Sequence, residues 1–294
     1  MVLAYYDGKL VEKESVKISP FDFGFARGMS LFEFSRIYGG IPFRLEDHIQ
    51  RFAQGAKAMG MPMPLSAEQI FASAKEIISR NKFEHSGIKF YLTMGECGNT
   101  GGYGFKNGEG FTPHFMMIEE AMNYQHPEAP YGMAAHERGV ALKPVPFSRQ
   151  ISEAKSINYS AGFTAVRNLR GTDFDEILYV HPQGYVTETT TSNFFCVIDG
   201  NLHTPAHEML QGITKKVIFE LANELKIPVI EKDLSLEELR FASEAFITGS
   251  FIEMMPVRQI EDITYPSTMD APVFAKLRKA FTSYISTYCK ERQK

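Results

Sequence analysis

The 294-residue chain has only three cysteines, Cys97, Cys196 and Cys289, and they show no metal-binding spacing. Their odd number argues against a framework of disulfide bonds and favours a reducing compartment, so we expect a cytoplasmic protein. The sequence has no basic run and a formal net charge of −4, which argues against nucleic acid as a partner. The N-terminal MVLAYYDGKL does not resemble a signal peptide, and no apolar segment is long enough to span a membrane.

Repeats and low-complexity segments are also absent, and 44% hydrophobic with 22% charged residues is an ordinary globular composition. The chain is longer than one hydrophobic core usually holds, so we expect two domains. We place an N-terminal domain at 1–125, a connector at 126–139 and a C-terminal domain at 140–294. The glycine-rich stretch ECGNTGGYGFKNGEGFTP lacks the strand–loop–helix context of a phosphate-binding loop, and we interpret it as a long loop without a nucleotide role.

Hydrophobic periodicity and turn residues predict alternating strands and helices in the first half. Asp7-Gly8 indicates a hairpin, and Ser66 with Gln69 indicates a capping box at the start of a helix. The helix before it is predicted from LEDHIQRFAQGAKAMG. The expected strands are 3–6, 10–16, 30–37, 41–45, 87–94 and 114–119.

The second half is predicted to alternate in the same way after a loop over 123–139. We expect helices near 160–170, after Gly212, near 235–241 and over 271–291. The expected strands are 140–146, 175–180, 185–198, 227–231 and 245–249.

The stretch GYVTETTTSNFF, residues 184–195, carries Glu188 in the middle of a strand that is apolar enough for a core. Carboxylates are rarely buried unless a cation meets them. Glu188 therefore predicts a positive partner, which could be a ligand or only a structural ion pair.

Two further polar features occur in the same half of the sequence. Lys155 precedes a predicted helix, and Gly212-Ile213-Thr214 begins another, where free amide groups favour an anion. An amine, a carboxylate and a phosphate cradle are the groups that pyridoxal phosphate requires. Each signal is weak alone, because such a lysine is usually solvated and such a helix start is usually a plain cap.

Taken together and in order, these segments resemble the fold-type IV pyridoxal phosphate enzymes, which include branched-chain aminotransferases, D-amino acid aminotransferases and aminodeoxychorismate lyases. The resemblance covers nearly the whole chain. It implies an α/β fold with a smaller N-terminal domain and a larger C-terminal domain, built on a mixed sheet or pseudo-barrel flanked by helices. The segments that carry it are FGFARGMSLFEFSRIYGG, FRLEDHIQRF, EAKSINY, GTDFDEILYV, GYVTETTTSNFF, LHTP, MLQGITKKV and EAFITGSFIEMMPV.

The resemblance also implies roles for individual residues in pyridoxal phosphate binding and catalysis. Lys155 matches the lysine that forms a Schiff base and moves the substrate proton, and Glu188 matches the carboxylate on the pyridine nitrogen. Arg51 matches the arginine at the phosphate, and Tyr159 a tyrosine directed at the ring hydroxyl. The remaining expected cofactor contacts are Thr191, Leu210, Gly212, Ile213, Thr214 and Ser250.

The implied activity is a ping-pong transfer of an amino group between an amino acid and a 2-oxo acid, without a metal ion. The sequence leaves open whether the amino acid is a branched-chain L- or a D-amino acid. A lyase and a non-catalytic cofactor-binding homologue remain alternatives, although Glu33, where lyases usually have threonine, favours transamination. The family also implies a homodimer with active sites near the subunit interface. The expected substrate-side residues are Arg27, Phe32, Lys89 and Phe251.

Overall fold

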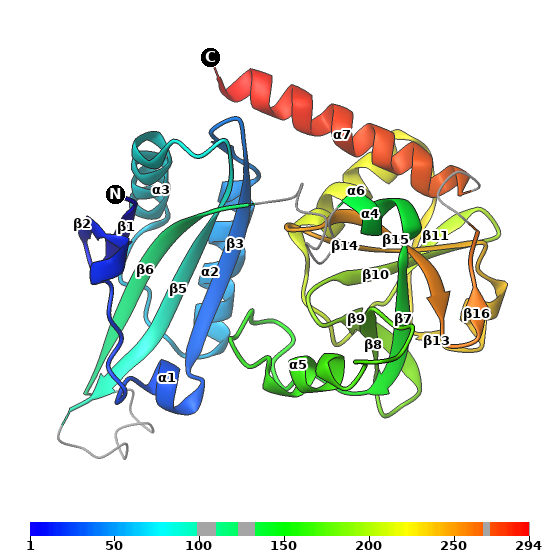
Figure 1. Ribbon diagram of the computed structural model, residues 1–294, viewed down its shortest axis with the longest axis horizontal. Helices are drawn as coiled ribbons and strands as arrows, with labels where there is room; N and C mark the ends of the chain where they lie inside the picture. The colour runs from blue at the N-terminus through cyan, green and yellow to red at the C-terminus, as the bar shows by residue number, and fades with distance from the viewer. Residues whose placement is uncertain (99–109, 123–132, 267–270, 294) are drawn as a thin grey trace. The chain divides into compact units, whose positions relative to one another are not determined.

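The computed structural model describes residues 1–98, 110–122, 133–266 and 271–293 (Figure 1). The chain forms two compact units. Unit 1 comprises Met1–Met122, Glu153–Asn158 and Cys289–Lys294, whereas unit 2 comprises Asn123–Ser152 and Tyr159–Tyr288. The short segment that carries Lys155 therefore belongs to unit 1, although the expected boundary assigned it to the C-terminal domain.

Unit 1 contains a six-stranded antiparallel sheet in the order β2-β1-β6-β5-β3-β4. Its helices α2 and α3 lie on one face of this sheet (Figure 1). The strands are β1 Leu3–Tyr6, β2 Lys9–Glu12, β3 Ser30–Tyr38, β4 Ile41–Pro42, β5 His85–Cys97 and β6 Phe111–Ala121, and the helices are α1 Phe23–Arg27, α2 Leu45–Ala58 and α3 Ala67–Asn81, with a 3-10 turn at Lys13–Ser15.

Local sequence signals explain where a turn and a helix of unit 1 begin. Asp7 and Gly8 both have positive φ in the β1–β2 turn, so the expected hairpin is confirmed. The capping box before α3 is also confirmed, because Ser66 Oγ accepts from the Gln69 amide at 3.3 Å and Gln69 Oε1 accepts from the Ser66 amide at 2.9 Å. The glycine-rich loop was expected at 96–113, but its ends are strand in β5 and β6, and residues 99–109 lie outside the described part.

The core of unit 1 forms between the helices and every second residue of β3, β5 and β6. Leu31, Phe90 and Met117 from the strands and Phe52 and Ile77 from the helices are all buried in one apolar cluster. Residues of the opposite parity in these strands face the other side of the sheet, because side chains alternate along a strand. Phe32, Lys89 and Tyr91 belong to this second face.

Unit 2 is built on a mixed sheet in which β10, β14, β15, β7, β8 and β9 pair in that order. An additional pairing of Asn193 with Glu188 joins β10 to β9 and closes these strands into a ring, as the expected pseudo-barrel requires. Each of these strands contributes to one buried cluster. The strands are β7 Val140–Pro146, β8 Glu176–Val180, β9 Tyr185–Thr189, β10 Asn193–Ile198, β11 Asn201–Thr204, β12 Val229–Glu231, β13 Leu234–Ser235, β14 Glu244–Gly249, β15 Glu253–Ile260 and β16 Ile263–Thr264.

The helices of unit 2 are α4 Met133–Arg138, α5 Ser160–Arg167, α6 Ile213–Glu224 and most of α7 Pro272–Arg292, with a 3-10 turn at Glu238–Phe241. The expected loop over 123–139 is wrong at its end, where α4 forms, and residues 123–132 lie outside the described part. The single strand expected at 185–198 is also wrong, since a turn at 190–192 divides it into β9 and β10. β11, β13, β15 and β16 were not expected.

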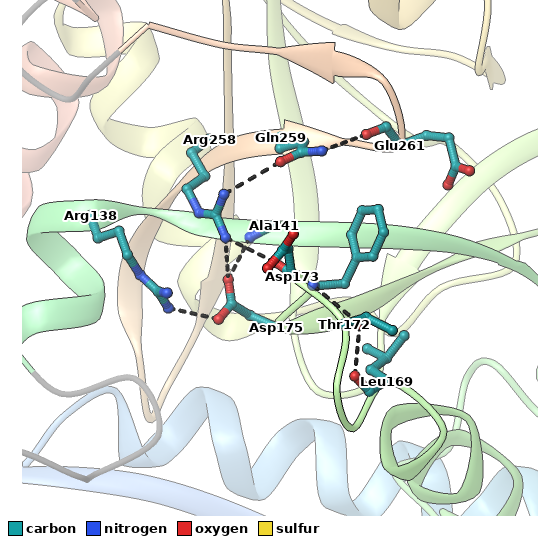
Figure 2. Close-up of polar contacts among 10 residues, drawn as sticks. Arg138, Ala141, Leu169, Thr172, Asp173, Asp175, Arg258, Gln259 and Glu261 are labelled. Carbon is teal, nitrogen blue, oxygen red and sulfur yellow. Dashed lines mark hydrogen bonds and ion pairs between the residues drawn. The ribbon is translucent and has the colours of Figure 1, made fainter.

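One carboxylate, that of Asp175, connects several elements of unit 2. Asp175 pairs with Arg138 of α4 at 2.6 Å and with Arg258 of β15 at 3.4 Å, and it accepts from the Ala141 amide of β7 at 2.8 Å (Figure 2). These contacts fix the start of β7 between the two strands with which it pairs in parallel, β8 and β15. Within the described residues, no helix has the length and apolar character needed to cross a bilayer.

Candidate active site

In unit 1, the segment that carries Lys155 lies along the edge of β3. The Phe32 amide donates to the Lys155 carbonyl at 2.9 Å, the Ile157 amide donates to Ser30 at 3.2 Å, and Leu31 forms a bridge with Ser156. The segment therefore continues the sheet beside β3 and holds the Lys155 backbone in a defined position. The Lys155 side chain is half-buried, and its Nζ lies 4.5 Å from the centre of the Phe32 ring.

Arg51 lies on α2, where it binds a carboxylate that the sequence had not assigned to it. Its Nε and Nη2 donate to the two oxygens of Glu33 at 2.8 and 2.6 Å, and His48 Nδ1 lies 3.3 Å from the same group. Burial opposes ionisation of Glu33, but Arg51 and His48 together hold its pKa well below its usual range. Burial lowers the pKa of His48 despite Glu33. Whether Arg51 also binds a phosphate stays a prediction.

The expected substrate-side residues have different surroundings. Phe32 is next to Lys155 and stacks on Tyr91 with 6.3 Å between ring centres, whereas Lys89 forms an ion pair with Glu120 at 2.5 Å. Arg27 lies at the end of α1 and donates to the carbonyl of the preceding residue. Tyr91 was missed, although its alternation with buried residues of β5 places it on the same sheet face as Phe32.

Phe251 belongs to unit 2, where it is 45% exposed in the turn after β14. Ser250 precedes it and is half-buried. This turn lies close to the exposed Thr191, because a Cβ on Gly249 would lie 3.4 Å from the Thr191 carbonyl oxygen and from Ser192 Oγ. The turns that carry Thr191 and Ser250 are therefore neighbours in unit 2.

Glu188 is buried near the end of β9, and its cationic partner in this structure is Arg149. The Arg149 Nε lies 2.5 Å from Glu188 Oε1, and the two side chains are 12% and 3% exposed. Burial alone would lower the pKa of Arg149, but Glu188 raises it above its ordinary value. The sequence analysis missed this arginine, because no periodicity or motif connects it with a carboxylate so much later in the chain.

Arg149 also contacts other groups near Glu188. Its Nη2 donates to the Thr190 carbonyl at 3.3 Å and lies 3.5 Å from the Tyr159 hydroxyl, while its guanidinium carbon lies 5.3 Å from the Tyr159 ring centre. The other oxygen of Glu188 accepts from the Leu210 amide at 3.3 Å. The expected cofactor residues Glu188, Tyr159 and Leu210 are thus brought together in unit 2 around Arg149.

Helix α6 begins close to this group. Gly212 is its N-cap and provides no side-chain cap, while Ile213 and Thr214 in the first turn are buried. Asn193 Nδ2 donates to the Leu210 carbonyl at 2.7 Å, and a Cβ on Gly212 would come within 1.9 Å of Asn193 Oδ1, so a larger residue there would displace the Asn193 side chain. Thr248 pairs with Asn193 across β10 and β14, and its buried hydroxyl has no partner among the described residues.

Comparison with known proteins decides what this arrangement belongs to. A model of the family described as amino-transferase class IV matches residues 30–260. The chain belongs to this family. As a class IV aminotransferase it is an enzyme that uses pyridoxal phosphate.

The relatives of this class IV aminotransferase extend over almost the whole chain. It is 30% identical to the putative branched-chain-amino-acid aminotransferase of Methanocaldococcus jannaschii, covering 94% of each chain. The solved branched-chain aminotransferase of Thermoproteus uzoniensis, crystallised with norvaline, is 25% identical with a TM-score of 0.82 over 95% of this chain and 94% of that one. A putative 4-amino-4-deoxychorismate lyase from Legionella pneumophila has a TM-score of 0.81 at 23% identity over 92% and 97% of the two chains, which shows the shared fold alone.

The donor set of unit 2 fits pyridoxal phosphate. A helix start without a side-chain cap and a buried Thr248 hydroxyl without a described partner suit a phosphate, which accepts hydrogen bonds. A buried carboxylate such as Glu188 suits a ring nitrogen that gains stability from a proton. The described residues contain no cluster of acidic, cysteine or histidine side chains that could hold a metal ion.

Proposed function

We propose that this class IV aminotransferase transfers the amino group between a branched-chain L-amino acid and a 2-oxo acid. The observation that carries the substrate class is the position of Lys155, whose amine lies against the Phe32 ring, with Tyr91 stacked beside it. Aromatic walls next to the reacting amine favour an apolar substrate side chain. The branched-chain aminotransferases among the relatives support the same class.

We propose that Lys155 would bond to the aldehyde carbon of the cofactor. Glu188 would contact the ring nitrogen of the cofactor, and Tyr159 its ring hydroxyl. Arg51, Ser250, Thr191 and the start of α6 at Gly212, Ile213 and Thr214 would hold its phosphate, and Leu210 would pack on its ring. When bound, pyridoxal phosphate withdraws electrons from the substrate's α-carbon so that a proton can leave.

The residues of this chain then have separate tasks in the reaction. Lys155 Nζ would take the proton from the substrate's α-carbon as a base and then, as an acid, deliver it to the cofactor carbon that carried the aldehyde. Glu188 would keep a proton on the ring nitrogen, and Arg149 at 2.5 Å offsets part of the cost of burying this carboxylate. Phe32 excludes water from the amine that moves the proton.

We also propose that the protein acts in the cytoplasm and as a homodimer whose active sites lie near the subunit interface. The three cysteines, without a disulfide among the described residues, support a reducing compartment. The family resemblance supports the dimer. Analytical ultracentrifugation of the purified chain tests it, and a monomer at micromolar concentration would refute it.

A panel of L- and D-amino acids tests the activity, with loss of the visible absorbance band of the bound cofactor as the signal. Branched-chain L-amino acids should remove the band, and a 2-oxo acid should restore it. Preference for D-amino acids or a turnover that releases pyruvate from aminodeoxychorismate would contradict the proposal, as would a band that no substrate changes. Lys155→Ala should have no band, whereas Lys143→Ala, at a lysine paired with Glu261 on the surface, should keep it.

A further inference from the structure

Lys215 is a buried lysine for which the proposed reaction has no use. It lies in the first turn of α6, directly after Thr214, and its side chain is only 2% exposed. The neighbouring Lys216 is exposed. Removing an ammonium group from water is costly, and burial lowers the pKa of Lys215. A lysine in this place therefore requires strong local contacts.

The Lys215 ammonium connects three parts of unit 2. It lies 3.0 Å from Glu231 Oε1 at the end of β12, donates to the Pro205 carbonyl at 3.2 Å, and lies 3.8 Å from Met209 Sδ. Pro205 directly follows Thr204, the last residue of β11, and Thr204 pairs with Glu231 of β12. The lysine thus joins the first turn of α6 to the ends of two strands and to the segment between β11 and α6.

This segment, residues 205–211, forms neither a helix nor a strand. Lys215 contacts Pro205 and Met209, whereas the next residue, Leu210, donates its amide to Glu188 and accepts from Asn193 through its carbonyl. A chain of direct contacts therefore runs from Lys215 through the segment to the buried carboxylate.

We propose that Lys215 is a positioning residue that fixes the segment 205–211 and, through Leu210, the orientation of Glu188. The effect on the cofactor rests on the proposed function, because Glu188 is there assigned to the ring nitrogen. The effect on the segment does not, because it depends only on contacts within unit 2. The ammonium suits this task, since it has three donors and its partners approach from different elements.

Amide hydrogen exchange on the full-length chain, with and without added pyridoxal phosphate, tests the effect on the segment. Lys215→Met keeps the length of the side chain but removes its donors. Exchange at Leu210 and elsewhere in 205–211 should become roughly ten- to a hundred-fold faster, as expected from the loss of hydrogen bonds to a charged group. Lys215→Arg should restore much of the protection, and Lys216→Met, the matched change at the exposed neighbour, should leave exchange unchanged.

Global stability does not decide the question, because replacing a buried charge by an apolar group can be neutral or stabilising. If Lys215→Met does not fold, Glu231→Gln supplies the test, because it keeps the lysine and weakens one partner that is 45% exposed. That variant should show a smaller increase in exchange, confined to 205–211 and β12. Unchanged exchange at Leu210 in Lys215→Met, or in Glu231→Gln if only that variant folds, would overturn the proposal.

The absorbance maximum of the bound cofactor tests the link to Glu188. Lys215→Met should shift this maximum relative to the wild type, Lys215→Arg should return it, and Lys216→Met should leave it in place. Faster exchange with an unshifted maximum would refute the part of the proposal that reaches Glu188. A wild-type chain that takes up no cofactor would refute the proposed function instead, and the exchange measurements would still test the role of Lys215 in the segment.

Discussion

An arginine–glutamate pair is buried in each unit, and the two pairs are built differently. In unit 1, two nitrogens of Arg51 meet both oxygens of Glu33, and His48 completes the group. In unit 2, Nε of Arg149 meets Glu188 at 2.5 Å. The rest of that guanidinium extends to Thr190 and Tyr159, and the second oxygen of the glutamate reaches Leu210.

The difference suggests that the Arg51–Glu33 pair serves mainly stability, whereas the Arg149–Glu188 pair orients a carboxylate for the reaction. Arg51 and Glu33 meet through two hydrogen bonds in the matched geometry of a guanidinium and a carboxylate, which holds the pair together directly. A pair whose members also reach other groups keeps the carboxylate charged while its neighbours set its direction. We therefore expect changes at Glu33 to act first on folding and changes at Glu188 to act first on turnover.

The largest expected effect is that of Glu33→Gln on stability. The amide removes the negative charge that Arg51 meets in this buried pair, which should cost about 3–5 kcal/mol of unfolding free energy. Denaturant titration measures it. Glu76→Gln is the control, because its exposed pair with Arg80 should contribute below about 1 kcal/mol. Equal losses in the two variants would remove the distinction between the bidentate pair and a surface pair.

The pH dependence of the unfolding free energy tests the contribution of Glu33 in a second way. The folded-state pKa of Glu33 lies below its unfolded value, so its contribution is complete at neutral pH and is lost progressively in acid. Glu119, on β6 of the same sheet, is the opposite case, because burial raises its pKa although Ser86 donates to it at 2.7 Å. Denaturant titrations at several pH values should show the deficit of Glu33→Gln shrinking as the pH falls. An advantage of Glu119→Gln should appear only as the pH rises, and parallel curves would contradict both signs.

Glu188→Gln should lower turnover roughly hundred- to thousand-fold, which corresponds to about 2.7–4 kcal/mol. The neutral amide no longer keeps a proton on the ring nitrogen, while Arg149 retains its contacts with Thr190 and Tyr159. Rapid-mixing measurement of the half-reaction gives the rate, and a melting curve on the same sample gives stability. A variant with a lower melting temperature but a normal half-reaction rate would show that the Arg149–Glu188 pair serves stability alone, like the Arg51–Glu33 pair.

Arg51→Lys keeps a cation beside Glu33 but removes the bidentate geometry. If Arg51 also serves the phosphate, the dissociation constant of the cofactor should rise by about one to two powers of ten, since hydrogen bonds to charged groups contribute about 1.5–3 kcal/mol. Equilibrium dialysis measures this affinity. An unchanged affinity together with reduced stability would mean that Arg51 serves Glu33 alone.

Lys89→Met should have the smallest effect on folding, below about 1 kcal/mol, because its pair with Glu120 is partly exposed at 31% and 40%. If Lys89 contacts substrate, KM should change for some amino acids while the melting temperature does not. A KM that stays constant across the substrate panel would leave Lys89 as a surface ion pair.

Sequence signals succeeded where structure depends on neighbours along the chain. The capping box of Ser66 and Gln69, the Asp7-Gly8 turn and the helix α2 each arise from neighbouring residues. The start of α6 at Gly212 was visible for the same reason. The resemblance to the family added Lys155 and Glu188 as candidates, and their roles stay predictions.

The partners of the candidate residues could not be predicted in this way. Arg149 follows β7 and Glu188 lies on β9, two strands that both pair with β8, and Glu33 meets Arg51 where α2 packs on β3. Such contacts depend on which elements pair, and one sequence does not specify that. The break at 190–192 was also missed, since its threonines favour strands as strongly as their neighbours do.

The return of residues 153–158 to unit 1 also constrains synthesis on the ribosome. The strands and helices of unit 1 up to Met122 emerge first, yet the edge of β3 from Ser30 to Phe32 obtains its neighbour only after Asn158 has been translated. Until then that edge presents unpaired amide and carbonyl groups to other nascent chains. A fragment ending at Met122 should therefore aggregate more readily than the whole chain. A peptide of residues 153–158 should reduce this aggregation, because it can pair with the free edge of β3.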